Sequence, residues 1–326
     1  MDEIRRISVY ESNSNDPYYN LAVEQHLLEA AGEDRCTLYL WQNENTVVIG
    51  RNQNAWKECR TELLRRDGVR LARRLSGGGA VFHDLGNLNF TFLMPQHAYN
   101  LDLQFSVIQR ALLRLGIETE RSGRNDILAS GRKFSGNAFY KNGTQAYHHG
   151  TLLFNVDMEK LGRYLSPSKA KLQAKGVESV RSRVVNLKEM NPDLTLEAMK
   201  QALRVSFEET YQLSAQTLGP EQLDADIVEK LRQRNCGWEW NYGRDLPFTC
   251  TLEDRFSWGG IQIDFRVDAG VIEKVRVHTD AMDWRLAENL EKMLTGCRFT
   301  SEELLAQLRG DPREEDLGNL IRNGLQ

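Results

Sequence analysis

Three consecutive glycines, Gly77 to Gly79, constrain the fold of this chain more than any other feature. They lie between a basic, strand-like segment that ends at Arg73-Arg74 and an apolar segment, residues 80–82, that has the character of another strand. Glycine leaves backbone N–H groups uncovered and reaches conformations that other residues avoid. Such a loop beside paired arginines is suited to hold an anion such as a nucleotide phosphate. For the glycines taken alone, an ordinary tight hairpin is the alternative.

A second basic glycine loop, residues 130–136, follows about fifty residues later and favours the anion-binding interpretation of the first. Lys133 is the candidate catalytic residue in this loop. Its ammonium group is a compact charge with three donors, so it can bridge a carboxylate and a phosphate. A fixed cation stabilises the charge that develops on the α-phosphate when ATP activates a carboxylic acid. A solvated lysine at a turn is the alternative that the local sequence leaves open.

Two widespread nucleotide-binding designs are excluded by the sequence. No Gly-Lys dipeptide occurs, so there is no Walker A loop, and the triple-glycine loop lacks the Gly-x-Gly-x-x-Gly spacing. Asn125-Asp126 is suited to hold a metal or a polar ligand group, with a simple Asx turn as the alternative. His83 and His149 are candidates for the site, and a role as satisfied structural histidines is the alternative for both.

Composition narrows the class of protein. With 326 residues, 40% apolar and 27% charged, the chain is predicted to be a soluble globular protein of two domains, or one large domain with an appendage. Its net charge of −4 gives no general reason to bind nucleic acid or a membrane surface. Neither a membrane-spanning run nor a signal-peptide core is evident, and the five cysteines are scattered and odd in number. These features favour reduced thiols in the cytoplasm.

Local patterns predict an α+β fold of mixed sheets with flanking helices. Asp16-Pro17 is suited to start a helix, with Gly32 beyond its end. We expect further helices at residues 103–115, 194–211 and 220–235, and strands at 36–41, 46–49, 69–73, 88–94, 126–128, 134–139 and 151–156. Adjacent His148 and His149 on a strand would point to opposite faces.

The character of the chain changes near residues 243–247. Two strands, at residues 256–267 and 271–278, are predicted to be joined by a hairpin turn at 268–270, followed by helices at 283–294 and 301–308. We therefore expect a large domain over residues 1–246 and a small α+β domain over residues 247–326.

Six ordered motifs resemble those of the lipoate–protein ligase A family, within the biotin/lipoate ligase superfamily. The likeness is strong over about residues 8–245 and weakest beyond Gly296. The motifs lie at residues 73–84, 122–126, 131–136, 148–153, 175–184 and 238–241. The resemblance implies a biotin/lipoate ligase-like catalytic domain with an accessory C-terminal domain that reorients between half-reactions.

The resemblance also implies an activity. Members of the family combine lipoate and Mg-ATP into lipoyl-adenylate, then pass the lipoyl group to a lysine of an apo lipoyl domain, as in 2-oxoacid dehydrogenase subunits or the glycine cleavage H protein. Lipoate needs an apolar tunnel, which the strands at residues 46–49 and 88–94 are candidates to line. A monomer suffices for this activity. Lys169, Lys171 and Lys175 are candidate contacts to an acidic lipoyl domain, with a solvated face as the alternative.

The matched motifs carry specific roles onto this chain. Lys133 would hold the lipoyl carboxyl and the α-phosphate through both steps. The basic loop at residues 175–183 would close over the intermediate. The remaining implied contacts fall into two sets: Arg74, Gly79, Ala80, Val81, Phe82 and Asp126 for ATP or the adenylate, with Asp126 also a candidate Mg²⁺ ligand, and Arg73, Ser76, His83, His149 and Gly150 for lipoate.

Three alternatives remain beside this interpretation. An octanoyl or lipoyl transferase of the same superfamily would work without ATP, through a cysteine acyl-enzyme. No cysteine lies between Arg60 and Asn235, which disfavours that mechanism. A non-catalytic protein that binds lipoate or an adenylate would be favoured if Lys133 or the glycines were missing, and they are present. A biotin ligase would share the fold but lacks its own glycine-arginine motif here.

Overall fold

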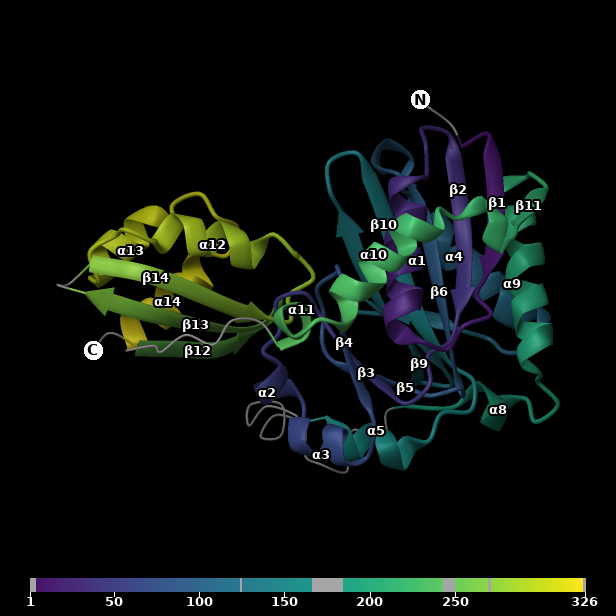
Figure 1. Cartoon of the computed structure of the whole chain (residues 1–326), viewed down its shortest axis with the longest axis horizontal. Coiled ribbons are helices and arrows are strands. Elements are labelled where there is room, and N and C mark those ends of the chain that lie inside the picture. The colour runs from purple at the N-terminus through teal and green to yellow at the C-terminus, as the bar shows by residue number, and fades with distance from the viewer. Residues whose placement is uncertain (1–3, 124, 166–183, 243–249, 269–270, 325–326) are drawn as a thin grey trace.

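The computed structural model describes residues 4–123, 125–165, 184–242, 250–268 and 271–324. An eight-stranded mixed sheet forms the centre of the larger part of the molecule (Figure 1). Its strands lie side by side in the order β11 (Ala215–Leu218), β1 (Arg6–Glu11), β2 (Arg35–Trp41), β6 (Asn87–Pro95), β10 (Gln145–Leu153), β9 (Arg132–Lys141), β8 (Asp126–Ala129) and β7 (Glu120–Ser122).

Strand direction changes across this sheet. β1 is parallel to both β11 and β2, whereas each following pair from β2 to β7 is antiparallel. The central strand β6 is buried at all nine positions because helices cover both faces of the sheet. Side chains alternate along a strand. The even-numbered side chains of β6 therefore pack in one core, while its odd-numbered side chains face the opposite helix layer.

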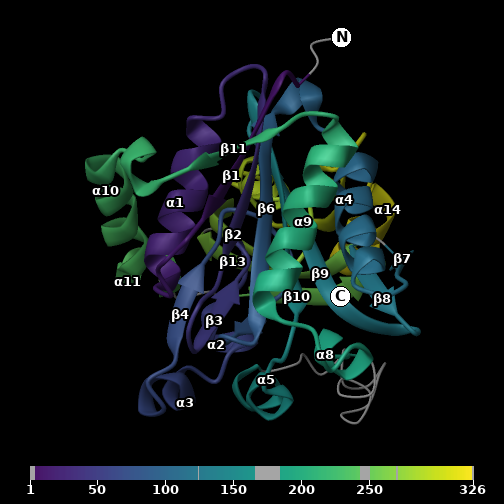
Figure 2. The ribbon, with the colours of Figure 1, turned by 90° about the vertical axis from the view of Figure 1, so that its right-hand side faces the viewer.

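Two helix pairs form the outer layers, as Figure 2 shows with the sheet between them. One layer holds α1 (Pro17–Glu29) and α10 (Ala225–Cys236), and the other holds α4 (Leu101–Arg114) and α9 (Leu196–Tyr211). α1 starts as predicted: Asp16 caps it by accepting a hydrogen bond from the Tyr18 N–H at 3.1 Å, and Pro17 occupies the first position.

A second, three-stranded sheet sits beside the first and carries the triple-glycine loop. Its strands are β4 (Arg70–Arg73), β3 (Thr46–Ile49) and β5 (Val81–His83), with β3 in the middle. The glycines connect β4 to β5, so this sheet holds the loop at both ends. Short helices surround the two sheets: α2 (Ala55–Glu58), α3 (Thr61–Arg66), η1 (Gln96–Ala98), α5 (Met158–Tyr164), α8 (Leu187–Met190), η2 (Pro220–Gln222) and α11 (Trp238–Tyr242).

The C-terminal part has a hydrophobic core of its own, drawn entirely from residues 252–321. A three-stranded antiparallel sheet supplies one side of it and three helices the other (Figure 1). These elements are β12 (Cys250–Phe256), β13 (Gly259–Asp268), β14 (Val271–Thr279), α12 (Leu286–Leu294), α13 (Ser301–Gln307) and α14 (Glu314–Gly324). The boundary expected between residues 246 and 247 falls in 243–249, outside the described residues.

The mixed α+β class is confirmed, and several predicted boundaries are wrong. The strand expected at residues 151–156 is β10, which begins at Gln145 and ends at Leu153; the polar histidines hid its first half. The helix expected at residues 220–235 starts at Ala225, because Asp224 caps it after the short η2 turn. β12 and α14 were not predicted, so the accessory sheet has three strands rather than two. The turn predicted at residues 268–270 includes 269 and 270, which lie outside the described residues.

Two further observations bear on the expected class of protein. Within the described part of the chain, no helix is both long and apolar enough to cross a membrane. All five cysteines are free thiols, as the scattered spacing predicted.

Candidate functional site

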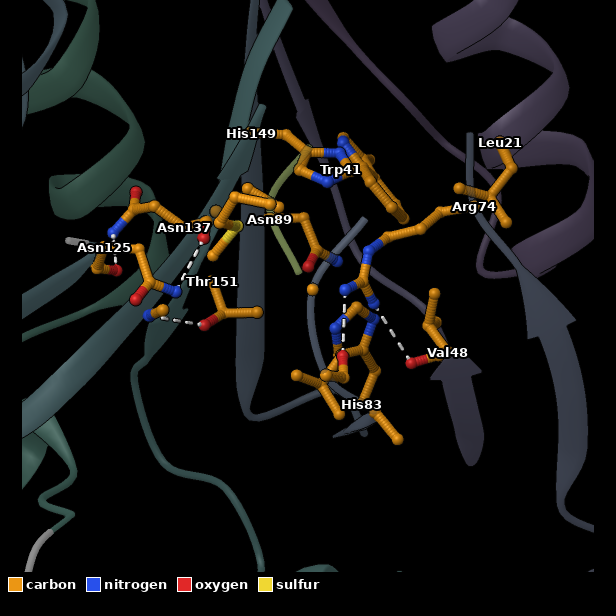
Figure 3. A pocket seen from close by; sticks show the side chains of 18 of the residues that line it. Leu21, Trp41, Val48, Arg74, His83, Asn89, Asn125, Asn137, His149 and Thr151 are labelled. Atoms are coloured by element: carbon orange, nitrogen blue, oxygen red, sulfur yellow. Dashed lines mark hydrogen bonds between the residues drawn. The ribbon is translucent and has the colours of Figure 1, made fainter. Parts of the chain in front are cut away.

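A pocket lies between the large sheet, the triple-glycine loop and one residue of the C-terminal part (Figure 3). Eight of the residues singled out from the sequence line it: Arg74, Gly79, Ala80, Val81, His83, Lys133, His149 and Gly150. Gly78, Asn125 and Gly136, from the two glycine loops and the Asn125-Asp126 pair of the sequence analysis, line it as well. The other lining residues are Leu21, Trp41, Val48, Asn89, Asn137, Ala138, Thr151 and Met282. Among the predicted site residues, Arg73, Ser76, Phe82 and Asp126 do not line it and lie behind or beside its wall.

Arg74 fixes the shape of the triple-glycine loop. Its guanidinium donates to the carbonyls of Gly77 and Gly79 at 2.7 and 2.8 Å, and to the Val48 carbonyl at 3.2 Å. Gly78 has a φ of +90°, and a Cβ there would lie 2.8 Å from the Arg74 Nη2 atom. Only glycine is therefore compatible with both the backbone and the arginine at this position. Burial lowers the pKa of Arg74 to about 10, which leaves it charged at neutral pH.

Arg73, its neighbour on β4, faces away from the pocket. Its guanidinium donates to five backbone carbonyls, among them those of Gln53 at 2.6 Å, Trp240 at 2.8 Å and Asn241 at 2.5 Å. Trp240 returns a hydrogen bond from its indole nitrogen to the Arg73 carbonyl at 2.9 Å. Arg73 thereby ties β4 to the segment that follows β3 and to α11. The structure thus assigns the two adjacent arginines to opposite sides of the small sheet.

Lys133 lies on β9 and pairs with Asp126 on the adjacent strand β8. The Nζ atom is 2.7 Å from Asp126 Oδ1, and each side chain is about one-third exposed, 33% and 35%. The Lys133 side chain also crosses Gly136, where a Cβ would come within 3.0 Å of Nζ. The second glycine loop therefore serves a different purpose from the first, since Gly136 leaves room for the lysine to reach the pocket.

A buried hydrogen-bond chain holds His149 in the pocket wall. His149 Nδ1 contacts Glu24 Oε1 at 2.8 Å, and its Nε2 contacts the Ser76 hydroxyl at 2.8 Å. Thr91 donates to the same Glu24 oxygen at 2.8 Å. Because the carboxylate accepts, Nδ1 carries a hydrogen and donates to Glu24. Glu24 is 1% exposed, so α1 contributes a buried carboxylate that links the large sheet to the glycine loop.

His148 shows the alternation predicted for the two adjacent histidines. It lies on the other face of β10, fully buried among Phe90, Phe92, Phe105 and Phe139. Burial lowers its pKa well below the usual range, so it is a neutral core residue. Its Nε2 lies 2.8 Å from Asn137 Oδ1, and it therefore supports the pocket wall from behind.

Gly150 follows on the same strand and has no room for a side chain. A Cβ there would lie 2.5 Å from Asn137 Oδ1 and 2.6 Å from Phe90 Cζ. The strands predicted to line an apolar tunnel contribute one residue each, Val48 from β3 and Asn89 from β6.

The C-terminal part reaches the site through residues 279–284. The Ala281 carbonyl accepts from the Gly78 N–H at 3.3 Å, and Met282 lines the pocket. Trp284 donates from its indole nitrogen to the Lys141 carbonyl at 2.7 Å and packs on Tyr140 with ring centroids 4.8 Å apart. The sequence offered no signal for this contact, because it joins residues that lie at least 143 positions apart in the chain.

Thiol chemistry and metal binding each require particular side chains at the site. No cysteine lines the described pocket, and burial raises the pKa of both Cys36 and Cys59 to about 12. The described residues contain no cluster of three or more His, Cys, Asp or Glu side chains that could hold a metal by themselves. The nearest carboxylate to Lys133 is Asp126. The predicted contacts at Lys169, Lys171 and Lys175, and the loop at residues 175–183, lie outside the described residues.

The fold and the pocket define the class: a catalytic domain of the lipoate and biotin ligase fold with a small C-terminal domain. The family model of the lipoyl protein ligase A/B catalytic domain matches residues 16–208, and that of the bacterial lipoate protein ligase C-terminus matches residues 246–324. The chain belongs to the lipoate–protein ligase family, and the predicted resemblance is confirmed.

Solved structures of similar shape agree with this assignment. P. falciparum LipL1, in complex with lipoate, is 29% identical with a TM-score of 0.86, and the match covers 98% of this chain and 99% of that one. A bi-partite lipoate protein ligase from Thermoplasma acidophilum, described with its E2 lipoyl domain, is 25% identical with a TM-score of 0.64, covering 75% and 98%. A lipoate-protein ligase A bound with ATP, 24% identical with a TM-score of 0.63 and covering 73% and 98%, shares the fold.

Proposed function

We propose that this protein is an ATP-dependent lipoate–protein ligase. In the first step a lipoate oxygen attacks the α-phosphorus of ATP, and pyrophosphate leaves to give lipoyl-AMP. In the second step the ε-amine of a lysine on an apo lipoyl domain attacks the acyl carbon, and AMP leaves with the bonding electrons while the amine loses a proton. The lipoate in the LipL1 structure and the lipoyl domain of the T. acidophilum system support these substrates.

The observation that carries the proposal is a pocket with two cations and no thiol. Arg74 and Lys133 both line it, whereas no cysteine does among the described residues. An acyl transfer through a cysteine needs an accessible thiolate, and the buried Cys36 and Cys59 remain protonated at neutral pH. A carboxylate and a phosphate brought together need cations that compensate their charge. The pocket has the composition for adenylation rather than for a thioester.

Lys133 is the proposed catalytic residue. In both steps negative charge lies close to the oxygen that bridges the acyl carbon and the phosphorus. A single ammonium group placed beside this oxygen can therefore stabilise the charge in each step. Asp126 at 2.7 Å orients the ammonium and balances its charge before the substrates bind. Arg74 is buried and donates to backbone carbonyls rather than to a carboxylate of the described residues, so a phosphate next to it would supply the missing countercharge.

The remaining site residues take supporting roles in this proposal. The backbone of Gly79, Ala80, Val81 and Phe82 would contact the adenylate at the loop edge. His149 and Gly150 would line the lipoyl chain, with Ser76 holding His149 from behind at 2.8 Å. Arg73 would not contact the substrates, because five backbone carbonyls already occupy its donors. It would act by holding the segment after β3 and α11 against β4.

Magnesium fits the residues present. Mg²⁺ in nucleotide sites is commonly held by substrate phosphates with one or two carboxylates. Asp126 is such a carboxylate next to Lys133, and the ion would neutralise the phosphates that leave as pyrophosphate.

Intact mass spectrometry of an apo lipoyl domain tests the proposal. We expect the lipoyl mass increment when this protein, lipoate and Mg-ATP are all present, and none when ATP is omitted or when the acceptor lysine is replaced by arginine. Lys133→Ala provides the matched enzyme control and should give no increment. Octanoylation from an octanoyl-carrier protein without ATP, with no increment from lipoate and ATP, would assign the chain to the transferases instead.

A further inference from the structure

Three arginines gather where the catalytic domain meets the C-terminal domain. These junction arginines are Arg51, which follows β3, Arg234, in the last turn of α10, and Arg285, directly before α12. The guanidinium carbons of Arg51 and Arg285 lie 5.3 and 5.1 Å from the centroid of the same Trp284 ring. That of Arg234 lies 4.3 Å from the centroid of Trp240 on α11, which sits beside the C-terminal domain in Figure 1. The cluster is therefore assembled from both domains.

None of the junction arginines forms an ion pair with a described residue. Arg234 donates to two side-chain amide oxygens at 2.7 and 2.8 Å, and its Nε atom is buried without a partner in the described part of the chain. Burial, and after it the charge of Arg51, lower the pKa of Arg234 from its usual value, so these two cations are close enough to repel each other.

The carboxylates near this cluster do not neutralise it. They have other partners: Glu288 pairs with Lys292 at 2.7 Å, Asp283 pairs with Arg313 at 3.1 Å, and Glu29 accepts from the Gln25 amide at 2.8 Å. The chain as a whole carries a net charge of −4. A local group of cations that its own carboxylates leave uncompensated therefore indicates an anionic partner.

The cluster borders the pocket on the side of the C-terminal domain. The Arg51 N–H donates to the Ser76 carbonyl at 2.9 Å, directly before the triple glycine. Trp284 lies two residues beyond Met282, which lines the pocket. A partner that delivers a group into the pocket from this side would consequently cover the junction arginines.

We propose that the junction arginines and Trp284 form a docking surface for an acidic protein domain, the one whose lysine accepts the acyl group. This inference rests on the proposed function, which requires such a domain at the mouth of the pocket. Arginine and tryptophan are enriched among the residues that dominate protein–protein binding. Trp284 is only partly buried and Arg285 is exposed, so both are accessible to a partner. Guanidinium groups pair with carboxylates through two parallel hydrogen bonds, which favours an acidic surface.

Lipoylation of an apo E2 lipoyl domain at increasing domain concentration, with lipoate and Mg-ATP saturating, tests this surface. Arg51→Glu and Arg285→Glu should each lower kcat/KM for the domain by about tenfold, within the range by which charge steering changes association rates. Pyrophosphate release from lipoate and ATP without the domain should stay at the wild-type rate. Added salt should lower kcat/KM steeply in the wild type and much less in the two variants, because salt screens the attraction.

Arg110→Glu is the matched control and should change neither rate, since Arg110 is exposed on α4, in the helix layer on the other face of the large sheet (Figure 2). Arg285→Glu keeps the test decisive if Arg51→Glu fails to fold, as judged by circular dichroism. Wild-type kcat/KM in both variants would overturn the inference and leave the ligase proposal intact.

Other outcomes separate the remaining occupants of this surface. A parallel fall in pyrophosphate release would assign the junction arginines to the nucleotide and overturn the inference. An equal fall in Arg110→Glu would trace the effect to net charge and overturn it too. Wild-type kcat/KM together with weakened retention on heparin would assign the surface to another polyanion. A wild-type protein that releases no pyrophosphate from lipoate and ATP would overturn the ligase proposal together with the inference.

Discussion

Gly77→Ala should weaken the docking of the C-terminal domain on the triple-glycine loop. A Cβ at residue 77 would lie nearer than 3.0 Å to the Ala281 carbonyl oxygen and 3.4 Å from the Met282 carbonyl oxygen, so a segment of the C-terminal domain must move. The backbone of Gly77 itself is not at positive φ, unlike that of Gly78. The effect of the substitution therefore comes from the domain contact and not from local strain.

Its magnitude follows from the contacts that would be lost. Four hydrogen bonds join residues 279–284 to the catalytic domain: Gly78 N–H to Ala281 O, Thr279 N–H to Asn52 O, Asn52 Nδ2 to Trp284 O, and Trp284 Nε1 to Lys141 O. At about 0.5–1.5 kcal/mol each, these hydrogen bonds contribute about 2 to 6 kcal/mol to the free energy of docking. The motional freedom that the domain loses on docking reduces this sum. Loss of even one, at about 1 kcal/mol, raises the undocked population roughly fivefold.

Hydrogen exchange at the Thr279 and Gly78 amides measures this population directly. We expect exchange at both amides to accelerate at least about fivefold in Gly77→Ala, in line with the loss of one hydrogen bond. Gly79→Ala is the matched control for docking, because a Cβ at residue 79 has no atom within 4 Å. Equal protection of Thr279 in the two variants would refute the reasoning, since the docked segment would then tolerate the methyl group.

Three further predictions concern the catalytic domain. Lys133→Ala should lower pyrophosphate release from lipoate and ATP by at least about a hundredfold with an unchanged circular dichroism spectrum; full activity would remove the assignment. Gly150→Ala should destabilise the protein by about 1–3 kcal/mol in urea denaturation, because the methyl group overlaps Asn137 and Phe90. Burial lowers the pKa of His83 to about 3, so between pH 6.5 and 3 the unfolded chain takes up a proton that the folded protein does not. The free energy of unfolding should fall as the pH decreases through that window, by roughly 3 kcal/mol at pH 4.5 from this residue, and His83→Gln should reduce the fall.

The sequence predicted the elements whose side chains follow a simple period. β3 was located to the residue, and α1 was located from its cap and its proline. The alternation of side chains along a strand was enough to predict that His148 and His149 lie on opposite faces of β10. β12 escaped because the pairing that stabilises it comes from β13, whose register no local pattern encodes. α14 was missed although Leu317, Leu320 and Ile321 recur at helical spacing and are buried.

Site residues were predictable where a motif contained them and not where distant segments meet. Glu24 lies on a correctly predicted helix, but its role depends on His149, 125 residues away. Asn89 and Met282 likewise belong to ordinary-looking segments, and only the folded sheet and the docked C-terminal domain bring them to the pocket. The available signal for Glu24 was its position at helical spacing from Leu21 and Leu28, on the apolar face of the predicted helix, because a carboxylate on such a face is seldom buried without a partner.

The adjacent arginines of β4 show why a motif alone does not assign function. The sequence alone does not distinguish Arg73 from Arg74. Both lie close to the glycines, and either is suited to bind an anion. A strand directs neighbouring side chains to opposite faces, so one of the two had to leave the site, and the alternation does not say which. The surroundings decide: five carbonyls take up Arg73, while Arg74 holds the loop that faces the pocket. Replacing either with lysine removes the fork geometry that reaches several carbonyls at once. The change at Arg74 should therefore distort the glycine loop, whereas the same change at Arg73 should loosen the segment after β3 and α11.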